Sequence, residues 1–325
     1  MKKIIITGVS GYIGSCLYFY LKDKYKIIGI DKISSKRLEI LSVNLLNEYK
    51  INRILAKEKP DLIIHLAAQS LVDETINKEK YYTNNVEVTK KLLKCMKNNN
   101  IKNLIFSSTA AVYKPKNNKI GENAKIKTVS TYAKTKFKCE KLINSSNLNS
   151  IILRFFNVCS SLSINKKIVG ELHNPETHLI PTVVYKNLYK KKVYLYGDNY
   201  NTLDGTCIRD YIHIKDICRA IEKSAKYLFK YKNKNKIFNI GSSEHLTNLQ
   251  IIKQIEKITK VKTNLQITKR RKGDVDKLAC SISNAKNFLN WKPNSSKISK
   301  IIKDEIKWIN YFKKLKLNRK FKNYL

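Results

Sequence analysis

The first half of the chain alternates short apolar runs with stretches of helical periodicity. Apolar runs of strand length occur at residues 3–8, 26–31, 62–67, 103–108 and 150–157. Between them, apolar residues recur every three or four positions, which predicts helices at 14–24, 51–59, 86–98 and 132–144. Strands that alternate with helices indicate βαβ units, so we predict an α/β fold with a doubly wound parallel (Rossmann) sheet. Ligands of such sheets bind at the carboxyl ends of the strands.

The pattern changes at about residue 160. Loop-rich segments follow at 173–181 and 194–205, then one more helix and strand near 215–241, and finally helices toward the C-terminus. We therefore predict two domains. The first comprises residues 1–160, with part of 211–241 returning to it, and the second is a smaller, discontinuous α/β lobe within 161–325.

Charge is the most unusual property of the composition. The 325 residues include 65 Lys and Arg against 25 Asp and Glu, which gives a formal net charge of +40. Lysine greatly outnumbers arginine, the better residue for bidentate phosphate recognition, and the lysines are spread over nearly every polar face. We therefore expect no specific nucleic-acid partner, although so basic a surface would attract polyanions at low salt.

Cysteine usage and the length of the apolar runs bear on the compartment. The cysteines are odd in number, are scattered singly and never form CxxC, which favours reduced thiols in the cytoplasm and implies neither disulfides nor a metal site. No run of about 18 apolar residues occurs, so we expect no membrane association. The cysteines are Cys16, Cys95, Cys139, Cys159, Cys207, Cys218 and Cys280.

A glycine-rich turn follows the first apolar run. Gly8, Gly11 and Gly14 are spaced G-x-x-G-x-x-G between a predicted strand and a predicted helix. In a dinucleotide-binding turn, such glycines permit the tight turn and let the backbone approach a pyrophosphate at the helix N-terminus. Asp31 ends the second apolar run, where a carboxylate binds the adenosine ribose and repels a 2′-phosphate. The combination predicts NAD, rather than NADP, as the cofactor.

Tyr132 and Lys136 stand one helical turn apart. By itself this spacing favours an ordinary surface pair. The fourth apolar run, however, ends in hydroxyl residues, which places Ser107 and Thr109 at the same sheet edge as the helix that Tyr132 begins. A hydroxyl, a tyrosine and a lysine together can transfer a proton, provided that the lysine ammonium and a positive nicotinamide lower the pKa of the tyrosine.

Longer motifs make the chain resemble a known family. The segments GVSGYIG (8–14) and YAKTK (132–136), together with Asp31, resemble the extended short-chain dehydrogenase/reductase family. Four further segments narrow the resemblance to the UDP-glucose 4-epimerases of that family, and the similarity extends from Lys2 to about Tyr311. They are GELHNPETHLIPTVV (170–184), YGDNYNTLDGTCIRDYIHIKDI (196–217), RRKGD (270–274) and NWKP (290–293). The resemblance implies that the first domain binds NAD and the second lobe a UDP-sugar.

The resemblance also implies roles for individual residues. Tyr132 would be the catalytic base and acid, with Lys136 tuning it and Thr109 beside it, and a homodimer would pack through the helices at 86–98 and 132–144. The implied NAD contacts are Gly8, Gly11, Tyr12, Ile13, Gly14, Asp31, Ser34, Asn44, Leu45, Leu66, Ala67, Ala68, Gln69, Asn84, Ser107, Tyr132, Lys136 and Phe156. The implied UDP-sugar contacts are Thr109, Tyr132, Asn157, His178, Leu179, Tyr194, Tyr196, Arg209, Tyr211, Arg271, Asp274 and Leu278.

The reaction that the resemblance implies is the interconversion of UDP-glucose and UDP-galactose, by transient oxidation at C4 of the sugar. Leu278 stands where the family varies a residue beside the sugar, so UDP-GlcNAc, UDP-GalNAc and UDP-pentoses are alternative substrates. Thr109 is followed by Ala110 and Ala111, which lack the acidic pair that a 4,6-dehydratase would need. Asn44 replaces an aspartate that usually contacts adenine, which weakens that contact. A noncatalytic NAD-binding protein with a polyanion-binding surface is an alternative of a different class.

Overall fold

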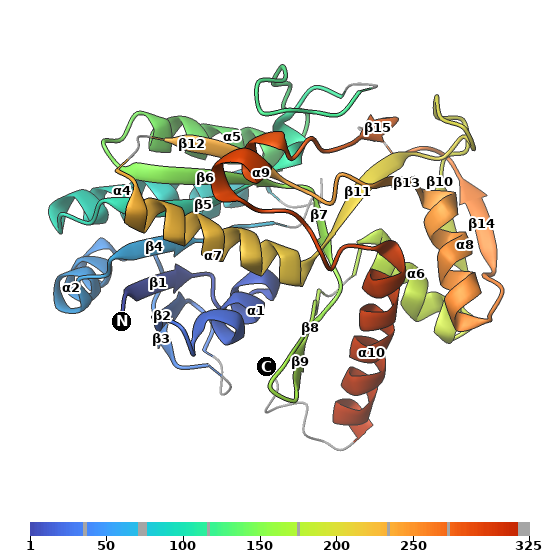
Figure 1. The fold of residues 1–325 in the computed structure, drawn as a ribbon, viewed down its shortest axis with the longest axis horizontal. Coiled ribbons are helices and arrows are strands. Elements are labelled where there is room, and N and C mark those ends of the chain that lie inside the picture. The colour runs from blue at the N-terminus through green and yellow to red at the C-terminus, as the bar shows by residue number, and fades with distance from the viewer. Residues whose placement is uncertain are drawn as a thin grey trace.

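The computed structural model describes residues 1–34, 38–70, 77–115, 118–173, 176–232, 235–271 and 274–317. Its largest feature is a seven-stranded sheet with the order β12-β6-β5-β4-β1-β2-β3, in which every neighbouring pair is parallel (Figure 1). The strands are β1 (Lys3–Thr7), β2 (Lys26–Asp31), β3 (Ile40–Ser42), β4 (Leu62–His65), β5 (Asn103–Thr109), β6 (Asn149–Phe155) and β12 (Lys236–Ile240). The prediction of a doubly wound parallel sheet is confirmed, and the five apolar runs correspond to β1, β2, β4, β5 and β6.

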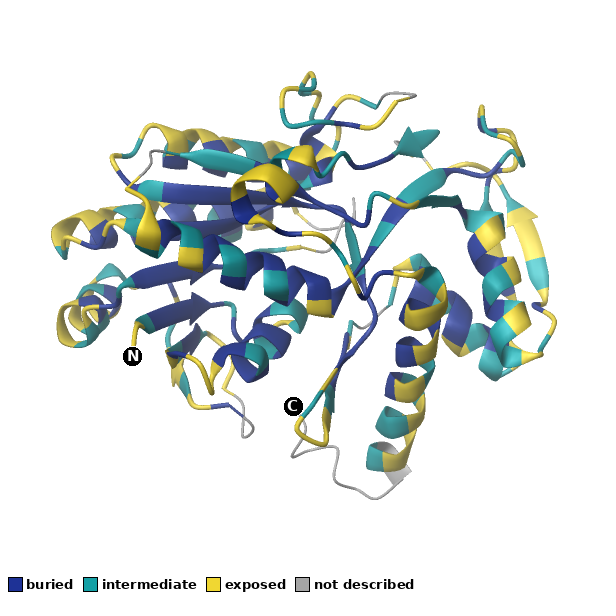
Figure 2. Ribbon diagram, in the orientation of Figure 1, coloured by how far each residue is buried: buried dark blue, intermediate teal, exposed yellow. Residues whose placement is uncertain are grey.

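Helices cover both faces of this sheet, which explains its continuous apolar runs. Ile4 and Ile6 of β1 belong to the apolar cluster on one face, whereas Ile5 belongs to the cluster on the other. Because successive strand residues face opposite sides, a strand covered on both sides must be apolar throughout. Figure 2 shows the strands of this sheet as largely buried. The helices are α1 (Tyr12–Leu21) and α7 (Ile214–Lys230) on the first face, and α2 (Glu48–Glu58), α4 (Val88–Asn98) and α5 (Thr131–Asn144) on the second.

The helix that precedes β5 is longer than the sequence predicts. The expected helix at 86–98 is preceded by α3 (Lys78–Tyr81) and by a π-helix, η1 (Tyr82–Glu87), which leads directly into α4. The wider turn of a π-helix breaks the 3.6-residue period, so apolar spacing alone does not reveal it. By contrast, α5 begins and ends within one residue of its predicted bounds.

The second half of the chain builds a smaller lobe. In this lobe α6, α8 and α10 pack around a separate apolar cluster, and β10 pairs with β14 in parallel. Strand β11 pairs with β13 in antiparallel orientation and with β15 and β7 in parallel. Among the described residues, no helix combines the length and the apolar character that a bilayer crossing requires. The remaining elements are η2 (Ala110–Val112), β7 (Asn157–Cys159), β8 (Leu162–Ile164), β9 (Lys167–Val169), α6 (Leu179–Leu188), β10 (Val193–Tyr196), β11 (Ile208–His213), β13 (His245–Thr247), α8 (Asn248–Thr259), β14 (Leu265–Thr268), β15 (Lys277–Leu278), α9 (Ser283–Leu289) and α10 (Ile298–Leu317).

The chain crosses between the large sheet and the smaller lobe more than once (Figure 1). Strand β6 leads almost directly into β7, which pairs with β11. After β11, helix α7 returns across the large sheet, and β12 then pairs with β6 at its edge. The two halves are therefore joined by strand pairing as well as by the covalent chain.

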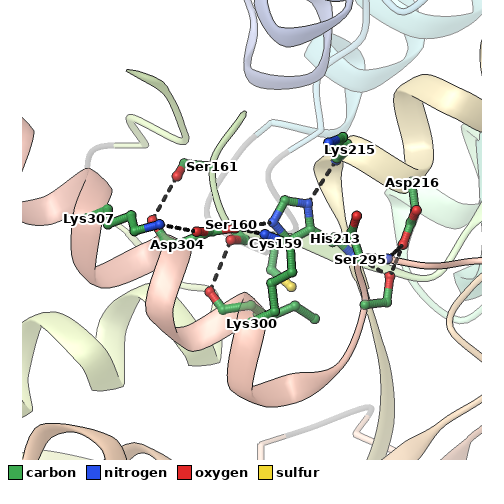
Figure 3. A network of polar contacts seen from close by, with 12 residues as sticks. Cys159, Ser160, Ser161, His213, Lys215, Asp216, Ser295, Lys300, Asp304 and Lys307 are labelled. Atoms are coloured by element: carbon green, nitrogen blue, oxygen red, sulfur yellow. Dashed lines mark hydrogen bonds and ion pairs between the residues drawn. The ribbon is translucent and has the colours of Figure 1, made fainter. Parts of the chain in front are cut away.

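A polar network fastens α10 to this junction (Figure 3). The Asp304 carboxylate accepts hydrogen bonds from Lys300 at 2.6 Å and Lys307 at 3.1 Å, and lies 3.2 Å from Nε2 of His213, the last residue of β11. Ser161 Oγ donates to the backbone carbonyl of Asp304 at 2.7 Å. Burial raises the pKa of Asp304, but hydrogen bonds from His213 and the two lysines outweigh it and hold the pKa below its ordinary value. The ionised carboxylate thus connects α10 to β11 and to the segment after β7.

Candidate active site

The glycine-rich turn predicted from the sequence joins β1 to α1. Gly8 has a φ of +74°, in the left-handed region that favours glycine, and its N–H donates to the Ile30 carbonyl at 2.9 Å. A side-chain carbon at Gly8 would lie 2.6 Å from the backbone nitrogen of Ala67, and one at Gly14 would lie 2.2 Å from the Gly8 carbonyl oxygen. The turn therefore closes only with glycine at these two positions. It leaves the N-terminus of α1 at the sheet edge, where it can receive an anion.

Asp31 ends β2 beside this turn. Its Oδ2 accepts the N–H of Ser10 at 3.0 Å, and its Oδ1 accepts the N–H of Ile33 at 3.1 Å. Ser10 Oγ also donates to the Ile33 carbonyl at 2.9 Å, which closes a small network around the carboxylate. These bonds hold Asp31 at the sheet edge with lone pairs left over for ribose hydroxyls.

A cavity of about 810 Å³ follows the carboxyl edge of the sheet. Residues at or just beyond the ends of β1, β2, β4, β5 and β6 line it, and its size is within the range of roughly 300–1,000 Å³ typical of ligand sites. All the predicted NAD contacts except Ser34 line this cavity, together with Thr109, Asn157, His178 and Leu278 of the predicted substrate site. Ser34 is exposed and lies outside the lining. The glycine turn, the Asp31 carboxylate and a cavity of this size together fit a dinucleotide.

Thr109, Tyr132 and Lys136 come together in this cavity. Thr109 is the last residue of β5, and Ser130 caps the start of α5 by accepting a backbone N–H, so that Tyr132 lies in the first helical turn. Lys136 is only 3% exposed, and its Nζ donates to the Ser107 carbonyl at 2.6 Å. This bond attaches α5 to the end of β5 and places the hydroxyl, the phenol and the ammonium at one edge.

Burial dominates the ionisation of the two titratable groups. Burial raises the pKa of the Tyr132 phenol to about 12, although a hydrogen bond with Thr109 lowers it. Burial lowers the pKa of the Lys136 ammonium to about 8. From the sequence, Lys136 and a positive nicotinamide together are expected to lower the pKa of the tyrosine. Burial of the phenol by the protein alone shifts the pKa in the opposite direction.

Seven of the predicted substrate contacts lie outside the cavity lining, in the smaller lobe. Arg209 of β11 donates through Nη2 to Asp274 Oδ1 at 3.1 Å, and the Arg271 guanidinium lies 3.8 Å from the ring centroid of Tyr196. Arg209 is also the register partner of Leu278, which lines the cavity, so this group adjoins the cavity. The seven residues are Leu179, Tyr194, Tyr196, Arg209, Tyr211, Arg271 and Asp274.

The segment before α6 supplies cavity residues that sequence reasoning missed. Glu171, Leu172 and His173 line the cavity beside the predicted His178. Glu171 Oε1 lies 2.7 Å from His173 Nδ1 and 3.1 Å from His178 Nδ1. Burial lowers the pKa of His178, but hydrogen bonds to Glu171 and Glu176 outweigh it and raise the pKa to about 10. The sequence feature that could have identified these cavity residues is the presence of two histidines and two glutamates in this one short segment.

A buried ion pair joins α5 to β6 next to the reacting residues. Arg154 donates to the Glu140 carboxylate through Nε at 3.0 Å and through Nη2 at 2.6 Å, and the two side chains are 4% and 1% exposed. Ser108 Oγ donates to the same carboxylate, and Arg154 Nη1 donates to the Tyr113 hydroxyl at 2.8 Å. Because Ser108 directly precedes Thr109, the pair fixes α5 against the end of β5. The sequence does not predict this ion pair, because neither residue belongs to a recognisable motif.

Comparison with known proteins agrees with this geometry. Residues 4–241 match the NAD dependent epimerase/dehydratase family. A UDP-glucose 4-epimerase of Lactobacillus helveticus is 33% identical over 321 residues, which cover 94% of this chain and 96% of that protein. The resemblance stated from the sequence motifs is thereby confirmed.

Solved structures show the same fold. A UDP-glucose 4-epimerase from Brucella ovis in complex with NAD has a TM-score of 0.88 and 29% identity, covering 95% of this chain and 98% of that one. One from Bifidobacterium longum in complex with NAD+ and UDP has a TM-score of 0.85 and 27% identity, with the same coverage. The fold, the glycine turn and the match over most of its length place this chain in the NAD dependent epimerase/dehydratase family.

Proposed function

We propose that this protein interconverts UDP-glucose and UDP-galactose by inverting C4 of the sugar, with NAD as its cofactor. The observation that carries the proposal is the single cavity that joins the glycine turn and Asp31 to Tyr132 and Leu278. Residues of both halves of the chain line it, so that a dinucleotide and a nucleotide sugar can meet there. The similarity to relatives named UDP-glucose 4-epimerase supports this choice of reaction.

The first domain, residues 1–160, would hold the cofactor. The N-terminus of α1 and the glycine turn would bind the pyrophosphate, Asp31 the adenosine ribose, and Lys136 the nicotinamide ribose. The Asp31 carboxylate would repel a 2′-phosphate, which favours NAD over NADP. Bound NAD+ supplies reversible hydride acceptance at C4 of the sugar.

Tyr132 would move the proton of the sugar 4-hydroxyl. Its phenolate takes that proton as C4 is oxidised, and the resulting phenol returns it when C4 is reduced from the other face. Since burial raises the pKa of Tyr132 to about 12, forming the phenolate requires nearby positive charge. Lys136, one turn further along α5, and the positive nicotinamide of bound NAD+ would supply that charge together. The Thr109 hydroxyl, which shares a hydrogen bond with Tyr132, would orient the 4-hydroxyl.

The second lobe, within residues 161–325, would hold the UDP and leave the sugar free to turn. Arg209 and Arg271 can form charge-assisted hydrogen bonds to a diphosphate, and their contacts with Asp274 and Tyr196 already orient the two guanidinium groups. Binding energy from the unreacting nucleotide would retain the oxidised sugar while it presents its other face. Leu278, at the cavity wall, would limit the size of the sugar.

Inversion at C4 tests the proposal directly. Purified protein is incubated with UDP-galactose, without added NAD, and the C4 configuration is followed by NMR. We expect inversion in the wild type and a loss of more than about 100-fold in Tyr132→Phe, which removes the base. Tyr49→Phe makes the same chemical change at a residue that is 70% exposed, and should retain wild-type activity.

Assays with further substrates distinguish the proposed reaction from the alternative functions. Inversion of UDP-GlcNAc in the same assay would extend the substrate range to N-acetylated sugars, whereas inversion of a UDP-pentose alone would replace the hexose assignment. No inversion of any of them, even with NAD supplied, would refute the proposal and leave the noncatalytic polyanion-binding alternative. Under that alternative, Tyr132→Phe would leave polyanion binding unchanged, and UDP would not compete with the polyanion.

We also propose a cytoplasmic homodimer. All seven cysteines are buried free thiols, which suits a reducing compartment. By the same family resemblance, two copies would pack through α4 and α5, whose outer faces are exposed (Figure 2). Light scattering at low and high salt measures the mass, and a monomer under both conditions would refute the dimer.

A further inference from the structure

A cluster of polar side chains at one wall of the cavity lies where the segment before α6 approaches α10. Glu171, His173, Glu176 and His178 each contribute one possible metal-ligand atom, and these atoms all lie within 4.8 Å of one another. His178 Nδ1 lies 3.1 Å from Glu171 Oε1 and 3.0 Å from Glu176 Oε1, while His173 Nδ1 lies 2.7 Å from Glu171 Oε1. Two of the five histidines of the chain therefore converge on the same carboxylate.

Buried polar atoms in this cluster have no hydrogen-bond partner. Glu171 is 7% exposed, and its Oε2 makes no hydrogen bond with any described residue. His173 Nδ1 has no hydrogen bond either, although it forms an ion pair with Glu171 Oε1 at 2.7 Å. Buried polar atoms without partners are rare in native proteins, and a ligand commonly satisfies them. The unpaired atoms therefore point to a ligand at this position.

The positive partners of the two carboxylates are the imidazoles of the cluster itself. Although the chain has 65 Lys and Arg residues, none of those described forms an ion pair with Glu171 or Glu176. Glu305 of α10 adds a third carboxyl group within electrostatic reach of the other two; it is 1% exposed, has an unpaired Oε2, and burial raises its pKa to about 8. Carboxylates that gather in a little-exposed place require positive charge. The two imidazoles supply it when they are protonated, and a bound cation would supply it in place of their protons.

We propose that Glu171, His173, Glu176 and His178 bind one divalent transition-metal ion, and that Zn²⁺ fits best. Two imidazole nitrogens and two carboxylate oxygens suit the donor preference of Zn²⁺ in a four-coordinate site. Ligand atoms about 2.0–2.1 Å from a tetrahedral ion lie about 3.3–3.4 Å apart, so the contacts of 2.7–3.1 Å need a small outward movement, and ligand atoms farther apart, within the 4.8 Å limit, need an inward one. Ca²⁺ and Mg²⁺ prefer oxygen ligands and match this set less well.

The ion would be structural and would stiffen one wall of the ligand cavity. Glu171, His173 and His178 line the cavity, and Trp308 Nε1 of α10 donates to the Glu171 carbonyl at 2.9 Å. An ion held by four protein ligands leaves no open position for catalysis, and it would tie the two ends of the 171–178 segment together beside α10. The scattered cysteines alone gave no reason to expect a metal site, because these four ligands are histidines and glutamates.

Zn²⁺ binding to the full-length chain tests the proposal. Protein without an affinity tag is stripped with EDTA, freed of chelator, and titrated with Zn²⁺ against a chromogenic chelator, while mass spectrometry counts the bound metal. We expect one ion per chain, with His173→Asn and Glu176→Gln each weakening binding by more than about tenfold. The matched control His245→Asn removes a histidine of β13 outside the cluster and should leave the affinity unchanged.

A second readout needs no variant. Diethyl pyrocarbonate modifies accessible imidazoles, so bound Zn²⁺ should protect His173 and His178 while the modification of His245 continues. The proposal is overturned if the wild type does not take up one ion per chain, if both variants bind as tightly as the wild type, or if saturating Zn²⁺ gives no protection. None of these measurements uses catalytic activity, so their outcome is independent of the test of the proposed reaction.

Discussion

Replacing Glu140 by glutamine would remove one charge from a buried ion pair while preserving the shape of the side chain. In the native protein the carboxylate accepts two hydrogen bonds from Arg154 and one from Ser108. In the variant the Arg154 guanidinium would remain buried without its counter-ion. Its other partners, the Tyr113 hydroxyl and the Glu122 backbone carbonyl, are uncharged and cannot neutralise it. We therefore expect Glu140→Gln to destabilise the protein strongly.

The burial of the Glu140–Arg154 pair determines how much of the free energy of unfolding Glu140→Gln should lose. Removing one partner of a buried ion pair costs about 3–5 kcal/mol, because the surviving charge loses its counter-ion and stays desolvated. The side chains are 4% and 1% exposed and the contact is bidentate, so the full range applies here. Native stabilities are roughly 5–15 kcal/mol, and the loss is therefore a large part of the free energy of unfolding. With a urea dependence of about 3 kcal/mol per molar, the unfolding midpoint should fall by about 1 M or more.

Urea unfolding followed by circular dichroism measures this shift, with Asp276→Asn as the control. Asp276 pairs with Arg270 at 3.1 Å, but the two side chains are 42% and 40% exposed. Breaking this exposed pair should cost less than about 1 kcal/mol. Similar midpoint shifts in the two variants would refute the argument that burial makes the Glu140 pair costly to break. Because Ser108 directly precedes Thr109, we also expect kcat of Glu140→Gln to fall.

Three other predictions concern the cofactor, acid stability and substrate size. Gly14→Ala should lose bound NAD during gel filtration, because the added carbon would lie 2.2 Å from a backbone oxygen. The control Gly121→Ala should keep NAD bound, because its added carbon would have no described atom within 4 Å. Asp304→Asn should flatten the loss of thermal stability below about pH 4. The folded pKa of Asp304 lies below the ordinary 3.8, so its stabilising contribution is present above that pH and is lost as the pH falls; an unchanged acid profile would contradict this. Leu278→Ala should raise kcat/KM for UDP-GlcNAc relative to UDP-galactose by about tenfold, because it makes room for the acetamido group, and the 96% exposed Leu203→Ala should not.

The central strands were predictable because they are buried on both faces. Ile4, Ile5 and Ile6 are each fully buried, so their run stands out in the sequence. The edge strand β3 escaped prediction because it has three residues, of which Leu41 and Ser42 are exposed. The π-helix before α4 escaped because its period differs from that of an α-helix. Sequence patterns therefore located the interior of the sheet better than its margins.

The residues of the candidate site also differ in how well the sequence predicts their positions. Residues in short contiguous motifs at strand ends, such as the glycine turn and Thr109, could be placed at the cavity because the carboxyl ends of parallel strands share one edge. The pairing of Glu140 with Arg154 could not be predicted, since it depends on how α5 lies against β6. Ser34 was assigned from resemblance alone, and it lies outside the cavity lining. The direction of the Tyr132 pKa shift also required the structure, because it depends on burial.

The bonds that join the segment after β7 to α10 have a consequence for synthesis on the ribosome. Ser160 and Ser161 donate to the backbone carbonyls of Ile301 and Asp304, which lie 141 and 143 residues further along the chain. The outer edge of β6 likewise stays unpaired until β12 has been synthesised. Until those later segments emerge, the nascent chain carries an open sheet edge and unsatisfied hydroxyl groups. Translation of the second half is therefore the interval in which the nascent chain is open to non-native association.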